Sequence, residues 1–212
     1  MTEKKEAPAI IKNDFHRKLY LHGAYIFGAL VVAILFIVFL IYLVLKPTKP
    51  QFTLQDITLN AFNVTSATTL TSNFQVTLSS RNPNARVGIY YDKIDIYASY
   101  RRQQITLPTM LPASYQGHKD VTIWSPYLFG NDVPMAPDLA VSLNEDETAG
   151  TVPINIKAIG RVRFKVGTYI SPRYMMNVNC PTYITFGSNN NGGYAINPAV
   201  KYALDVGCTV EV

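Results

Sequence analysis

The chain has 212 residues, of which 48% are hydrophobic and 16% charged, and its formal net charge is +5. This mild positive charge, without a basic motif interleaved with aromatic residues, argues against a nucleic-acid partner. The length suits one domain with a substantial core, in addition to a membrane segment.

Residues 23–45 read GAYIFGALVVAILFIVFLIYLVL and contain no charged side chain. As a helix they would be roughly 35 Å long, enough to cross a hydrocarbon core of about 30 Å. A buried helix of a soluble protein is the alternative, but such helices rarely lack a polar face. A cleaved signal peptide has a shorter apolar region, about 7–15 residues, and a small-residue cleavage pattern that is missing here. The run therefore predicts a retained transmembrane helix.

Basic residues around the span predict its orientation. Five of them precede it and two follow it closely: Lys4, Lys5, Lys12, Arg17, Lys18, Lys46 and Lys49. Because the more basic flank stays in the cytosol, we expect a cytoplasmic tail over 1–22, the helix over 23–45 and an extracytoplasmic domain over 46–212. The polar tail is expected to lack regular structure. Asn63 begins an Asn-Val-Thr acceptor for glycosylation and falls on the predicted outer side.

The outer part reads as an all-β domain. Alternating segments bounded by turn residues predict strands over 52–62, 74–80, 87–100, 104–107, 119–124, 138–143, 152–167, 173–186 and 199–211. Residues 125–130 are predicted as one helical turn, with Ser125 as cap and Pro126 after it. The acidic run 144–147 and the Asn/Gly-rich run 188–193 are predicted as loops. Short strands in this number favour a β-sandwich.

Cys180 and Cys208 both lie in the outer part, on the predicted core face of late strands. An oxidising compartment permits a disulfide between them if the two strands are neighbours. Two buried free thiols are the alternative, because cysteine is often simply a core residue.

Catalytic patterns are weak in this sequence. The outer part has a single histidine, His118, whereas a metal cluster needs several converging ligands. It has no G-x-S-x-G nucleophile elbow and no Gly-rich phosphate loop, so we expect neither an enzyme nor a cofactor.

Arg161, Arg163 and Lys165 alternate with apolar residues in the strand predicted over 152–167. Successive side chains of a strand point to opposite faces, so these cations should form one outward stripe about 13 Å long, which Arg173 could extend. A solvated face that discourages edge aggregation is one interpretation. An anionic ligand, such as demethylated pectin or lipid headgroups, is the other.

Three motifs occur together after the predicted span. They are Asn82-Pro83-Asn84 followed by Tyr90-Tyr91-Asp92, then Tyr115-Gln116-Gly117-His118-Lys119, and finally Gly160-Arg161-Val162-Arg163-Phe164-Lys165-Val166-Gly167. With the anchor and the Lys-Pro-x-x-Pro segment after it, the chain resembles the plant harpin-induced and non-race-specific disease-resistance-like membrane proteins. Their outer part belongs to the late embryogenesis abundant type 2 class.

The resemblance implies an immunoglobulin-like β-sandwich without catalysis, in a plasma-membrane protein of plant defence and the hypersensitive response. Some relatives end in a hydrophobic tail that directs a lipid anchor, whereas this chain ends in an alternating strand.

Read from the residues alone, the first two motifs have the chemistry of turns. That structural role is favoured, and a binding surface is the alternative, because exposed loops often carry function.

The sequence is compatible with three functions: an interaction protein in defence signalling, a stress protectant, and a module that binds cell-wall polymer or lipid. Patterning for a packed core counts against passive protection, since protectants are commonly hydrophilic and disordered.

Overall fold

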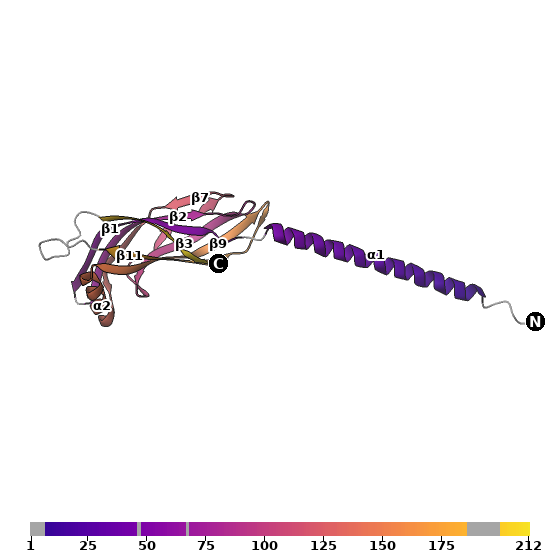
Figure 1. The fold of residues 1–212 in the computed structure, drawn as a ribbon, viewed down its shortest axis with the longest axis horizontal. Helices are drawn as coiled ribbons and strands as arrows, with labels where there is room; N and C mark the ends of the chain where they lie inside the picture. The colour runs from indigo at the N-terminus through magenta and orange to yellow at the C-terminus, as the bar shows by residue number, and fades with distance from the viewer. Residues whose placement is uncertain (1–6, 46–47, 67, 186–199) are drawn as a thin grey trace, which may run out of the picture. The chain divides into compact units, whose positions relative to one another are not determined.

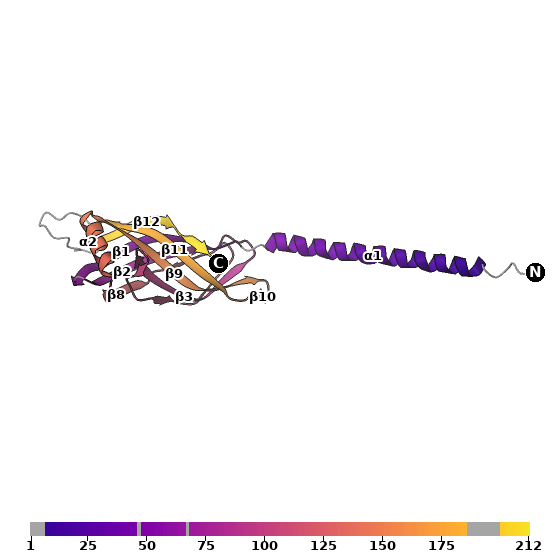
Figure 2. The same ribbon diagram turned by 90° about the horizontal axis from the view of Figure 1, so that it is seen from below.

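The computed structural model describes residues 7–45, 48–66, 68–185 and 200–212 (Figures 1 and 2). The chain divides into two compact units, Met1–Lys46 and Pro47–Val212. The first contains one apolar helix and the second is mostly β-strand, which confirms the predicted all-β class with a helix before it. The loop predicted over 188–193 lies outside the described residues.

The first unit is the helix α1 (Ala7–Leu45). Within it, residues Tyr20–Leu40 are long and apolar enough to cross a membrane, with a mean hydropathy of 2.7, and none of this stretch is buried in the protein. The helix fits a membrane anchor. The expectation of an unstructured tail is wrong from Ala7 onward, because the helix begins there. Pro8 lies in its first turn, where a missing N–H is tolerated.

Two antiparallel sheets form the second unit. Sheet A has the order β12-β1-β2-β7, with β8 also paired to β2. Its strands are β1 (Gln51–Ser66), β2 (Thr69–Arg81), β7 (Val121–Trp124), β8 (Tyr127–Pro134) and β12 (Val200–Gly207). Sheet B has the order β13-β11-β9-β3-β4, with β10 paired to β9 and both β5 and β6 paired to β3. Its strands are β3 (Gly88–Tyr100), β4 (Gln103–Gln104), β5 (Thr109–Leu111), β6 (Ser114–Gln116), β9 (Thr151–Val166), β10 (Tyr169–Ile170), β11 (Tyr174–Thr185) and β13 (Thr209–Glu211).

The core lies between the two sheets, where every second side chain of the long strands is buried. Strand β9, for example, alternates buried and less buried positions from Val152 to Val162. Phe52, Tyr91 and Trp124 form an aromatic cluster in this core, with ring centroids 5.4–6.3 Å apart. Removal of this apolar surface from water is the main force that holds the sheets together.

Two local predictions are wrong. Residues 125–130, expected as a helical turn, end in the strand β8, which pairs with β2. The segment expected as a strand over 138–143 belongs instead to the helix α2 (Pro137–Thr148), and so does the acidic run after it. Pro137 suits a first helical position. Ala140 and Leu143, three residues apart, are the buried side chains of α2, so a helical period accounts for their burial better than the alternation read from the sequence.

The C-terminal segment was expected as a single strand, but it is divided between the sheets. β12 pairs with β1 in sheet A, and β13 pairs with β11 in sheet B. Cys208 is the residue between the two strands, and it forms a disulfide with Cys180 of β11. The bridge therefore joins sheet B to the point where the chain leaves sheet A.

Candidate functional site

The turn Asn82-Pro83-Asn84 binds Thr48, the first described residue of the second unit. The Asn84 side chain accepts a hydrogen bond from the Thr48 N–H at 2.8 Å and donates one to the Thr48 carbonyl at 2.7 Å. Asn84 also donates its own N–H to Asn82 Oδ1 at 3.0 Å. Asn82 is fully buried and donates to the carbonyls of Val87 and Gly117, each at 2.8 Å. We call this arrangement the Asn84 clasp.

A second polar network adjoins the Asn84 clasp, and the Asp120 carbonyl bonds to both. The hydroxyl of Tyr91 is 2.8 Å from Ser80 Oγ and donates to Gln116 Oε1 at 2.9 Å. Gln116, also fully buried, donates to the Ser80 carbonyl at 2.6 Å and to the Asp120 carbonyl at 3.2 Å. Burial raises the pKa of Tyr91 above its usual value, so its hydroxyl keeps the proton that it donates.

These contacts decide the role of most motif residues. Asn82, Asn84, Tyr91 and Gln116 are buried, and their polar groups bond to each other in pairs and to nearby main-chain groups, so they specify the fold at this end of the sandwich. Lys119 takes part as well: its N–H bonds to the Asn84 carbonyl, and its ammonium bonds to the carbonyl of Pro83. Pro83, Gly117 and His118 of the motifs belong to the two turns, and the His118 side chain is exposed.

Tyr90 and Tyr115 lie on the opposite, outward face of sheet B. Their ring centroids are 4.6 Å apart, and the ammonium of Lys165 is 5.4 Å from the ring of Tyr115 and 6.0 Å from that of Tyr90. Gly88 permits this packing, because a Cβ there would lie 2.4 Å from the Tyr115 hydroxyl. Tyr115 is 46% exposed, so the pair offers an accessible aromatic surface beside a cation.

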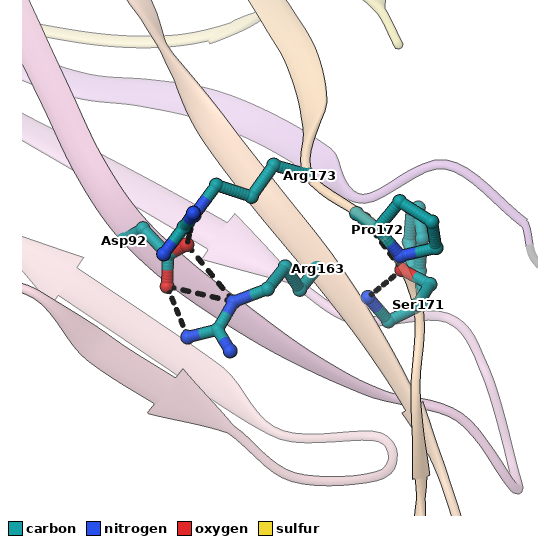
Figure 3. Close-up of polar contacts among 6 residues, drawn as sticks. Asp92, Arg163, Ser171, Pro172 and Arg173 are labelled. Carbon is teal, nitrogen blue, oxygen red and sulfur yellow. Dashed lines mark hydrogen bonds and ion pairs between the residues drawn. The ribbon is translucent and has the colours of Figure 1, made fainter.

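Asp92 joins two strands of sheet B through two arginines (Figure 3). Arg163 of β9 donates from Nε and Nη2 to both carboxylate oxygens, and Arg173, the residue before β11, donates from Nε at 3.0 Å. Hydrogen bonds from Arg163, followed by those from Arg173 and by both positive charges, hold the pKa of Asp92 below its ordinary value, although burial opposes them. The Asp92 side chain is only 19% exposed, so this carboxylate is committed to the fold.

The predicted cation stripe is therefore not uniform. Arg163 faces outward but is bound to Asp92, whereas none of the ion pairs among the described residues involves Arg161 or Lys165. We use the name cation–tyrosine patch for Arg161, Lys165, Tyr90 and Tyr115. The sequence did not predict that two arginines would share one carboxylate, because Asp92 and Arg163 are 71 residues apart in the chain.

Asn63 lies in β1 at an exposed position opposite Thr71 of β2. Its use as a glycosylation site remains a prediction. Within the described part of the chain, no group of three or more His, Cys, Asp or Glu side chains gathers closely enough to hold a metal ion.

The comparisons with known proteins agree with these motifs. The model of the late embryogenesis abundant protein family matches residues 77–180, which contain all three motifs. NDR1/HIN1-like protein 1 of Arabidopsis thaliana is 53% identical over 188 residues, covering 86% of this chain and 90% of that protein. The chain belongs to the NDR1/HIN1-like family.

Another NDR1/HIN1-like relative, protein 12 of Arabidopsis thaliana, is 48% identical and covers 86% of this chain and 87% of its own length. The solution structure of a late embryogenesis abundant protein is 17% identical and has a TM-score of 0.34, covering 68% of this chain and 74% of that one. The NDR1/HIN1-like and late embryogenesis abundant names point to a non-enzymatic class of protein. The immunoglobulin-like variant of the sandwich stays a prediction.

Proposed function

We propose that this NDR1/HIN1-like protein is a single-pass protein of the plasma membrane that acts in plant defence, including the hypersensitive response, by binding other molecules. Its N-terminus faces the cytosol, and residues 46–212 lie outside the cell. The observation that carries the proposal is the 53% identity to NDR1/HIN1-like protein 1 over 90% of that protein. The names of the relatives suggest a defence-related protein, and the apolar stretch Tyr20–Leu40 supplies a segment that fits the membrane.

The outer domain is suited to binding because buried hydrogen-bond networks fix one end of the sandwich and its surface is varied. The clasp and the Tyr91 network hold buried polar groups in fixed positions, which gives a stable scaffold. The outward face of sheet B also presents side chains that take part in none of the ion pairs among the described residues, among them Arg161 and Lys165. A rigid scaffold beneath an exposed face is how non-catalytic binding domains achieve specificity.

Proximity labelling in living leaf tissue tests the binding role. A biotin ligase is fused to the N-terminus of the full-length protein in one set of plants and to its C-terminus in another. We expect the C-terminal fusion to label extracellular receptors and the N-terminal fusion to label cytosolic proteins. A set of proteins labelled by the C-terminal fusion that contains no receptors or other defence proteins would contradict the signalling proposal.

Protease treatment of intact protoplasts tests the orientation separately. Protease should remove residues 46–212 and spare an N-terminal tag, because the more basic flank stays in the cytosol. Glycosidase should shift the wild-type band, and Asn63→Gln should remove that shift. Loss of the N-terminal tag would reverse the proposed topology.

A second candidate function, binding of an anionic cell-wall polymer or lipid headgroup, is favoured by the cation–tyrosine patch. The ammonium of Lys165 lies over two tyrosine rings, and Arg161 is exposed on the same strand. Each cation near an anionic surface contributes on the order of 1 kcal/mol, and salt screens the attraction.

Binding measurements on the full chain in phosphatidylcholine nanodiscs test this candidate. The probes are polygalacturonate and a water-soluble short-chain phosphatidylserine, which distinguish the two sources of negative charge. Arg161→Gln/Lys165→Gln should weaken binding of one of them. Arg81→Gln/Arg102→Gln, which removes the same charge from exposed positions elsewhere, should not. Equal binding by both double variants, or binding that salt does not change, would reject this candidate.

A further inference from the structure

A shallow groove of about 340 Å³ lies on the outward face of sheet B and contains none of the residues of the cation–tyrosine patch. Its lining residues come from four strands in the order β3, β9, β11 and β13. Ile159 in the groove is two residues from Arg161 of the patch on β9, about 7 Å at the rise of a strand, whereas Lys157 in the groove is eight residues, roughly 26 Å, from Lys165. The groove therefore adjoins Arg161 but lies apart from the lysine and the tyrosine pair. Its volume lies within the range of about 300–1,000 Å³ that is usual for ligand sites.

The register of sheet B aligns the lining residues in two rows. Tyr97 of β3 lies opposite Lys157 of β9, which lies opposite Asn179 of β11, and Asn179 lies opposite Thr209 of β13. The second row, two residues further along each strand, contains Ile159, Asn177 and Glu211 in the same way. At about 4.8 Å between neighbouring strands, the first row is roughly 14 Å across.

The chemistry of these rows is mixed and almost neutral. Two amides, a threonine hydroxyl, a lysine and a glutamate together supply both hydrogen-bond donors and acceptors. Tyr97 adds an aromatic ring at one edge. Asn179 Oδ1 is buried and has no hydrogen-bond partner among the described residues, although buried polar atoms are nearly always paired. If the amide of Asn179 turned towards the groove, a ligand hydroxyl there would supply the missing donor.

The disulfide positions one wall of the groove. Cys180 follows Asn179 in β11, and Cys208 precedes Thr209 in β13. The bridge thus fixes β13, which has only three residues, beside β11. Without this link, a strand so short would hold Thr209 and Glu211 weakly.

We propose that the groove is a binding site for a segment of a neutral oligosaccharide. Sugar hydroxyls donate and accept hydrogen bonds, which matches paired amides and opposite charges better than an anion does, since Glu211 would repel one. The apolar face of a pyranose ring packs on an aromatic side chain such as Tyr97. An extended peptide fits less well. Strand addition needs a free sheet edge, so a peptide would pair with β13 at the side of the groove, whereas the β9 and β11 backbones at the groove floor are paired on both sides.

The proposal goes beyond the function proposed above and rests on a different set of residues. Calorimetry on the full chain in phosphatidylcholine nanodiscs tests it with three neutral probes. Cellohexaose and a xyloglucan oligosaccharide represent cell-wall glycans, and a high-mannose oligosaccharide represents the glycans of glycoproteins. Polygalacturonate serves as the charged comparison.

We expect saturable binding of one neutral probe by the wild type. Tyr97→Ala and Asn177→Ala should each weaken it at least tenfold. Asn177 is exposed, so its replacement leaves the core intact. Tyr183→Ala is the matched control, since Tyr183 lies on the same face of β11 beyond the groove and is 63% exposed. Retained binding in that variant supports the assignment.

Three results would overturn the proposal: no neutral probe binds the wild type, the groove variants bind as well as the wild type, or polygalacturonate alone binds. Each can occur whether or not the labelling experiment finds defence proteins, so failure of the groove and failure of the signalling role are distinguishable.

Discussion

Replacement of Tyr91 by phenylalanine should destabilise the outer domain although it removes a single oxygen atom. The side chain is 1% exposed, and its hydroxyl bonds to Ser80 Oγ and Gln116 Oε1. Each buried group left without a partner costs about 1–3 kcal/mol. Because the Ser80 hydroxyl can rotate towards another acceptor, we take the lower part of that range for both groups, a total of about 2–4 kcal/mol.

Trp124, the single tryptophan of the chain, reports this unfolding by its fluorescence. Its ring centroid is 5.4 Å from that of Tyr91. For a domain of this size each kcal/mol lowers the melting temperature by about 2–4 °C, so the midpoint should fall by roughly 4–16 °C. Tyr90→Phe, at the adjacent and half-buried position, is the control and should change the midpoint little. Equal midpoints for the two variants would refute the argument that the network stabilises the fold.

Three further changes test other parts of the fold by the same fluorescence. Asp92→Asn should make the stability of the domain less sensitive to acid. The folded-state pKa of Asp92 is lowered, so its contribution to the free energy of unfolding is complete above the ordinary pKa of 3.8. That contribution is lost as the pH falls through the folded-state pKa. The wild-type midpoint should therefore drop more than that of the variant as the pH is lowered below about 4. Parallel profiles would contradict the ion pair. Cys180→Ala/Cys208→Ala should lower the free energy of unfolding by about 3–4 kcal/mol in the chain-entropy model, for a separation of 28 residues. Two free thiols found by mass spectrometry in the non-reduced wild type would exclude the bridge. Gly160→Ala places a Cβ 2.3 Å from a main-chain oxygen of β3 and should lower the free energy of unfolding by about 1–3 kcal/mol or more. Gly207→Ala is the control, because a Cβ there meets nothing within 4 Å. Similar losses of stability in both variants would show that crowding is not the cause.

The long strands and the apolar helix could be predicted because their signals are local. Alternation over ten or more residues, as in β9, leaves one face for the core whatever the partner strand is. Leu139, Val141 and Leu143 also alternate over a short window, which predicts a strand where the chain forms the helix α2. Burial of Ala140 with Leu143 distinguishes the two periods, and that burial depends on neighbours distant in sequence.

Predictions about the site were limited for the same reason. The sequence identified the motif residues, but not which of them are buried, because Tyr90 and Tyr91 differ only in the face of the strand they occupy. The division of the C-terminal segment between two sheets had no local signal, since its alternation continues from Val206 through Cys208 to Val210. The groove rows depend on the register of four strands, which only the folded chain defines.

The Asn84 clasp also has a mechanical consequence. If the outer domain is held by a membrane on one side and by a wall polymer on the other, tension reaches Thr48 before any other described residue of this domain. There it meets two hydrogen bonds between Thr48 and Asn84, and Asn84 is itself bonded to Asn82. Beyond them the pull runs along β1, which is paired to β2 on one side and to β12 on the other. Hydrogen bonds loaded along a doubly paired strand share the force and must yield together, so the domain should resist pulling from its membrane end far better than peeling from an edge strand such as β13.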